Sequence, residues 1–131
     1  TVRYFPLDAG AGGTNGETTE SLAWEIAPTP GNWRNLRIRL KVAPGAGTTR
    51  TFKVRKNGVD TGVAVNIVHP ATYGEDLVND FDVVAGDRLD MYLGFAGGAP
   101  VFSHIAWGLD WTPAIPGEYI HMGTSTGALD T

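Results

Sequence analysis

The chain of 131 residues contains no cysteine, which excludes disulfide bonds, thiolate metal sites and cysteine nucleophiles. It also has no Asn-x-Ser/Thr sequon, so N-glycosylation is not expected. No apolar stretch approaches the roughly 20 residues that a membrane helix needs. The net charge of −4 argues against the basic surface that nucleic-acid binding favours. We therefore look to packing and to contacts between subunits for stability and function.

Residues that could form a catalytic centre are also scarce. A serine nucleophile needs a histidine base and an orienting carboxylate that converge in space. Ser103 and His104 are neighbours on an expected strand, so their side chains point to opposite faces. The three histidines show neither H-x-x-x-H nor H-x-H spacing, and a zinc site is not expected. We expect a non-enzymatic protein that uses no cofactor.

The strongest structural signal is a β-hairpin. Two runs of alternating apolar and polar residues, at 50–56 and 62–68, flank Asn57-Gly58. Asn-Gly readily adopts the positive φ angles of a tight two-residue turn, which makes it the best short-range indicator of a hairpin.

Short alternating runs continue along the chain and are separated by turn residues, with 18 glycines and 8 prolines in all. We expect eight strands, at residues 2–7, 22–27, 34–42, 50–56, 62–68, 77–84, 88–95 and 101–112. No segment shows a sustained helical period with caps. The pattern predicts an all-β fold, an eight-stranded antiparallel β-sandwich of the jelly-roll type, with an immunoglobulin-like sandwich as the alternative.

The four tryptophans divide into expected core residues and one expected surface residue. Two alternating rows are expected to face the core, namely Leu22, Trp24 and Ile26, and Ile105, Trp107, Leu109 and Trp111. Trp33 follows Gly31-Asn32 and is the tryptophan expected to be exposed. It is therefore the candidate glycan contact if the domain binds carbohydrate.

Charged residues gather in two places. The acidic segment supplies weak calcium candidates, although a solvated loop with edge-strand charges is the favoured interpretation: Glu75, Asp76, Asp80 and Asp82. The basic residues are expected on two neighbouring strand regions: Arg34, Arg37, Arg39 and Lys41, with Lys53, Arg55 and Lys56. A solvated sheet face, a contact with an acidic neighbouring subunit and, more weakly, phosphate or nucleic-acid binding would each explain the basic set.

The composition changes after Trp111. We expect a β-sandwich domain at 1–112 and a proline-bounded tail or connector strand at 113–131. The tail could pack on its own domain, pair with a neighbour's sheet edge or begin a further domain. Apolar residues near the two ends of the chain are the candidate assembly residues: Tyr4, Phe5, Tyr119, Ile120 and Met122.

Three segments carry a family resemblance: T-F-K-V-R-K-N-G-V-D-T-G-V-A-V-N-I, V-V-A-G-D-R-L-D-M-Y-L and W-G-L-D-W. In this order they resemble jelly-roll domains of tailed-phage virion proteins, such as tail fibres and capsid decoration proteins. More distantly, they are similar to the complement globular-head and tumour-necrosis-factor group. The resemblance covers about residues 22–111, and the tail lies beyond it.

The resemblance implies a structural protein of a virion surface or an extracellular assembly. Such domains typically form trimers or sit on a lattice, so the expected partners are further copies of the chain and a major capsid or fibre protein. Neither nucleic acid nor membrane is an expected partner. Two alternatives stay open, a carbohydrate-binding module and a filament subunit linked by donor-strand exchange.

Overall fold

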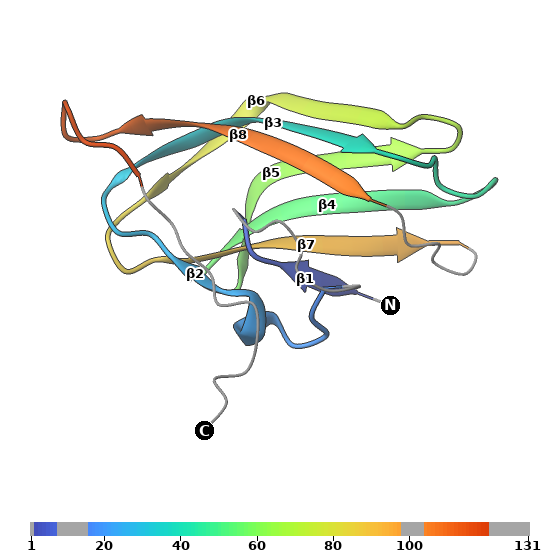
Figure 1. The fold of residues 1–131 in the computed structure, drawn as a ribbon, viewed down its shortest axis with the longest axis horizontal. Coiled ribbons are helices and arrows are strands. Elements are labelled where there is room, and N and C mark those ends of the chain that lie inside the picture. The colour runs from blue at the N-terminus through green and yellow to red at the C-terminus, as the bar shows by residue number, and fades with distance from the viewer. Residues whose placement is uncertain (1, 8–15, 98–103, 121–131) are drawn as a thin grey trace.

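The computed structural model describes residues 2–7, 16–97 and 104–120. These residues form eight strands and one short 3-10 turn, shown in Figure 1. In chain order they are β1 (Arg3–Phe5), η1 (Glu20–Ala23), β2 (Glu25–Ile26), β3 (Gly31–Leu40), β4 (Thr49–Lys56), β5 (Val59–Val68), β6 (Tyr73–Val83), β7 (Arg88–Ala96) and β8 (Ile105–Pro113). The predicted turn is present between β4 and β5, where Asn57 and Gly58 have φ angles of 53° and 79°.

The strands form two antiparallel sheets, which confirms the predicted eight-stranded sandwich. Sheet A has the order β1-β7-β4-β5, with β2 also paired to β7, and sheet B has the order β6-β3-β8. The two sheets lie one above the other in Figure 1. The pairs β4–β5, β3–β6 and β2–β7 nest inside one another along the chain, as in a jelly roll. The next nested pair would be β1 with β8, but β1 pairs with β7 instead.

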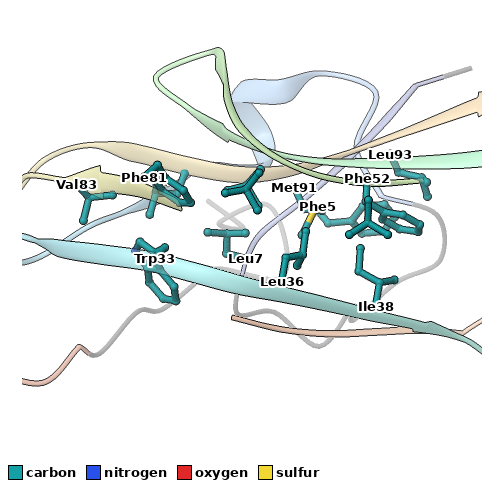
Figure 2. Packing of buried hydrophobic residues seen from close by; sticks show 14 of the residues in the cluster. Phe5, Leu7, Trp33, Leu36, Ile38, Phe52, Phe81, Val83, Met91 and Leu93 are labelled. Carbon is teal, nitrogen blue, oxygen red and sulfur yellow. The ribbon is translucent and has the colours of Figure 1, made fainter. Parts of the chain in front are cut away.

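The core lies between the sheets, where the alternating residues of facing strands meet. Leu36 and Ile38 of β3 lie opposite Phe52 of β4 and Met91 of β7, and all four are fully buried (Figure 2). Fully burying each such side chain stabilises the fold by about 1.5–3 kcal/mol. The two-residue period of these strands, visible in the sequence, therefore places the core correctly.

The predicted phase of the second strand is wrong. Leu22 and Ile26 were expected in the core, but they are 67% and 55% exposed, and Ala23 and Glu25 are buried instead. Leu22 belongs to η1, and β2 contains only two residues. Strand β2 pairs with β7, which places Glu25 opposite Leu89 on the inner side of the sheet. Because side chains alternate along a strand, this register turns Ile26 outward.

The first part of the expected tail contacts its own domain. The Ala114 amide donates a hydrogen bond to the Pro30 carbonyl, and the Thr29 hydroxyl donates one to the Glu118 carboxylate. Ile120 packs against the core. Residue 113 is still part of β8, one residue past the expected end of the domain. The beginning of the expected eighth strand, at 101–103, and Met122 lie outside the described residues.

Candidate functional site

Strand β8 is the long exposed edge of the sandwich. It contains nine residues and pairs with β3 on one side, and no described strand pairs with its other side. Its residues alternate between half-buried and exposed along its whole length. The exposed residues, which face the solvent, are Ala106, Gly108, Asp110 and Thr112. We call the outer edge of β8 the open side.

The inner row of β8 was predicted to be core, and the structure leaves it only partly covered. Ile105, Trp107, Leu109 and Trp111 pack against the core but stay half-buried. The Trp107 indole donates a hydrogen bond of 2.8 Å to the Leu7 carbonyl. Its ring also meets Phe5 edge-on, with the centroids 5.9 Å apart. These contacts fix Trp107 in place, while the row as a whole stays half-buried.

The opposite edge of the sandwich, formed by β5 and β6, is closed; we call it the closed side. The Ala64 amide of β5 donates a hydrogen bond of 3.1 Å to Oδ2 of Asp76 on β6. A Cβ at Gly74 would lie 2.5 Å from Val65 Cγ1, so only glycine permits this approach of the two strands. The remaining edge is formed by β1 and β2, which contain only three and two residues. Short and covered edges resist unwanted pairing, so β8 is the edge most suited to it.

Asp76 shapes the closed side. It is buried, and its two oxygens accept hydrogen bonds from the amides of Ala64, Val78 and Asn79 and from the Asn79 side chain. Burial alone raises the pKa of Asp76, but these hydrogen bonds outweigh it and hold the pKa below its ordinary value. The strand bulges here, because residues 77–79 of β6 oppose the single residue Asn35 of β3. The bulge leaves Val78 89% exposed.

The calcium candidates lie on β6 rather than on a loop. Glu75 pairs with Arg37, and Asp82 accepts a hydrogen bond from Asn32. The oxygens of Asp76 are occupied by protein amides, as described above, and Asp80 lies opposite Arg34 in the register. Within residues 2–7, 16–97 and 104–120, no group of three or more histidine or acidic side chains is placed to hold a metal ion.

The basic residues do not form one face. In the first set, Arg34, Arg37 and Arg39 lie on β3 in sheet B, and Lys41 follows directly after it. The second set lies on β4 in sheet A, so the expectation of neighbouring strand regions is wrong. On β3, Arg37 pairs with Glu75 and donates a hydrogen bond to the Tyr73 hydroxyl, and Arg39 lies over the Tyr73 ring. Carboxylates of β6 therefore compensate much of the β3 charge.

A partly buried polar cluster on the outer face of sheet A was not predicted. Arg55 of β4 pairs with Glu20 of η1 at 2.5 Å and with Asp60 of β5 at 2.6 Å. Asp90 of β7 lies opposite Arg55 in the register and is fully buried. Burial, and secondly the negative charge of Glu20, raise the pKa of Asp90 to about 8. The alternation of β7 placed Asp90 in solvent, and no sequence signal showed that η1 would cover this face.

The candidate assembly residues do not form one surface. Phe5 is buried in the core, and Tyr4 lies on the outer face of sheet A against Tyr92, with ring centroids 5.9 Å apart. Tyr119 is highly exposed, whereas Ile120 packs on its own core. Their role in assembly stays a prediction.

Trp33 is buried, so the expectation that it is exposed is wrong. Strand β3 begins at Gly31, three residues earlier than predicted, which brings Trp33 into the inward-facing row. It lies between Phe81 of β6 and Trp111 of β8 in the sheet register. A sugar-stacking role needs an exposed ring face, which Trp33 does not offer.

Comparisons of the chain with protein-family models, with curated proteins and with solved structures gave no significant match. In the part of the chain that the structure describes, no helix is long and apolar enough to cross a membrane.

Proposed function

We propose that this chain is a non-enzymatic structural protein of a virion or extracellular assembly. It decorates a capsid or builds a fibre through contacts between subunits. The observation that carries the proposal is the open side: a nine-residue strand edge lined by half-buried tryptophans. An edge of this kind invites β-strand addition, in which main-chain hydrogen bonds supply affinity and side chains supply specificity.

Two further observations support assembly. The bulge of β6 exposes Leu77 and Val78, and the loop after β6 exposes Val84. Together with the edge of β8, these residues give sheet B apolar groups at both of its margins. Exposed apolar groups next to polar ones are typical of contact surfaces. The virion itself is suggested by the resemblance of the sequence segments alone.

The test is the mass of the chain in solution, measured by light scattering over a wide concentration range. We expect an oligomer whose fraction rises with concentration. A monomer at every concentration would overturn the proposal. Calcium should leave the mass unchanged, because the oxygens of Asp76 are already occupied within the fold.

The contribution of the tail needs a variant that spares the core. Deleting residues 117–131 would remove Ile120, which packs on the domain, and could therefore unfold it. Tyr119→Ser changes a highly exposed side chain and leaves that packing intact. If the tail connects subunits through Tyr119, the variant should form smaller oligomers than the parent chain. An unchanged oligomer mass would show that Tyr119 is not part of the contact.

A further inference from the structure

We propose that two copies of this chain pair through their β8 edges, antiparallel and around a twofold axis at Leu109. This inference rests on the proposed function and names the contact that performs it. The pairing joins the two copies of sheet B into one six-stranded sheet. An isologous contact of this kind makes pairs, so it links two subunits or two trimers and does not close a trimer.

The sequence of β8 is nearly palindromic about Leu109. It reads Trp107-Gly-Leu-Asp-Trp111, so antiparallel pairing at Leu109 sets each tryptophan opposite the other tryptophan of the second copy. Leu109 meets its own counterpart. Aromatic and aliphatic cross-strand pairs contribute about 0.2–1 kcal/mol each relative to alanine pairs. A self-complementary strand favours a second copy as its occupant over an unrelated partner.

On the inner side of the contact, the apolar row of β8 is only half-buried within its own chain. In a jelly roll with fully nested pairs, the first strand lies beside the last, but here β1 pairs with β7. The inner row of β8 consequently stays half-buried, although Trp107 already rests on Phe5 and Leu7. A second β8 would cover the free flank of this row and pair the main-chain groups of the edge.

The outer side of the contact places no two like charges directly opposite each other. Pairing about Leu109 places Gly108 opposite Asp110 of the second copy and Ala106 opposite Thr112. Asp110 is the charged residue of β8, and Asn35 of the same chain donates a hydrogen bond of 2.7 Å to its carboxylate. Edges that avoid pairing usually carry lysine, proline or inward-pointing charges. Strand β8 has no lysine and no inward-pointing charge, and its proline, Pro113, is the last residue of the strand.

A disulfide trap tests the register, and the cysteine-free chain supplies a clean background. The double variant Ala106→Cys with Thr112→Cys changes two exposed outer residues that face each other only across the proposed contact. Within one chain they lie about 20 Å apart, far beyond the reach of a disulfide. Each single variant is a matched control. In the proposed dimer its cysteine lies about 20 Å from the same cysteine of the second copy, too far for a disulfide. Under mild oxidation, we expect linked dimers from the double variant and none from either control.

A charge-reversal pair tests the same contact without cysteine. A side chain at Gly108 meets open space within its own chain. Gly108→Asp creates two directly opposed carboxylate pairs in the dimer, and Gly108→Lys creates two attractive pairs with Asp110. We expect the aspartate variant to weaken association about tenfold or more and the lysine variant to bind at least as tightly as the parent chain.

The outcomes separate the two proposals. Oligomers that fail to crosslink in the double variant and ignore the charge at Gly108 overturn the β8 contact and leave the proposed function standing. A chain that is monomeric in light scattering and does not crosslink overturns both. Equal losses of association in both Gly108 variants, with thermal unfolding unchanged, also overturn the contact, because it predicts opposite signs.

Discussion

The two long edges of the sandwich differ in how they are covered. On the closed side, Gly74 and Asp76 allow β6 to lie against β5. Asp76 also accepts hydrogen bonds from the amides at the bulge of β6. On the open side, no described strand pairs with the outer edge of β8, and no described side chain joins that edge to another strand as Asp76 joins β6 to β5. The difference is one of contacts within the domain: β5 and β6 contact each other across the closed side, and no described strand covers the outer edge of β8.

The largest expected loss of stability follows from removing the Asp76 carboxylate and the hydrogen bonds that it accepts. Asp76→Ala leaves the amides of Ala64, Val78 and Asn79 without their acceptor. An unsatisfied donor costs about 1–3 kcal/mol where water cannot reach it, and less at the exposed Val78. We expect the free energy of unfolding to fall by about 3 kcal/mol in urea titrations. The exposed Asp82→Asn is the control. A loss below about 1 kcal/mol would show that water replaces the carboxylate.

Two strand glycines compare the margins directly. Gly74→Ala forces a methyl group to within 2.5 Å of Val65, whereas Gly108→Ala meets nothing within 4 Å. Overpacking of this kind typically costs about 1–3 kcal/mol, and an exposed surface change stays within about 0.5 kcal/mol. Thermal unfolding of the two variants should therefore differ clearly. Similar midpoints would mean that β5 and β6 separate easily and that the closed side is not closed in solution.

A pH dependence is also expected from the outer face of sheet A. Asp90 is buried like Asp76, but its pKa is raised to about 8 while that of Asp76 is lowered. Between about pH 4 and pH 8 the folded chain keeps a proton on Asp90 that the unfolded chain releases. The stability of the fold therefore falls as pH rises through this range and levels off above about pH 8.

The variant Asp90→Asn removes this titration. Urea unfolding of the parent and the variant at several pH values between about 5 and 8 measures both slopes, with the exposed Asp80→Asn as a control. We expect the slope of the parent to be lost in the Asp90 variant and kept in the control. If all three slopes agree, another group is responsible.

The parts of the fold that local chemistry decides could be predicted from the sequence. Asn57-Gly58 gave the hairpin, and the two-residue period of β3 and β7 gave the core rows. The failures share a cause, which is a dependence on distant partners. The pairing of Glu25 with Leu89 reversed the face of β2, and the early start of β3 buried Trp33. A shift of one residue exchanges the two faces of a strand, and no local signal reports it.

The candidate site was predicted only in part. The apolar row of β8 was visible as an alternating pattern, and the structure confirms that its members share a face. No described strand pairs with the outer edge of β8, because β1 joins β7 instead, from nearly ninety positions away along the chain. The burial of Asp90 likewise depends on η1 and Arg55. Neither arrangement follows from the residues of one strand.

The nested strand pairs also set an order in time. Loop-closure entropy grows with the length of chain enclosed, so the hairpin of β4 and β5 is the cheapest pair to form, and β3 with β6 and β2 with β7 enclose successively longer loops. Strand β8 docks onto β3 across a still longer separation. On this order the edge of β8 forms last. Until β8 docks, the side of β3 that it covers is itself unpaired, so a partly folded chain exposes a different strand edge from the finished domain.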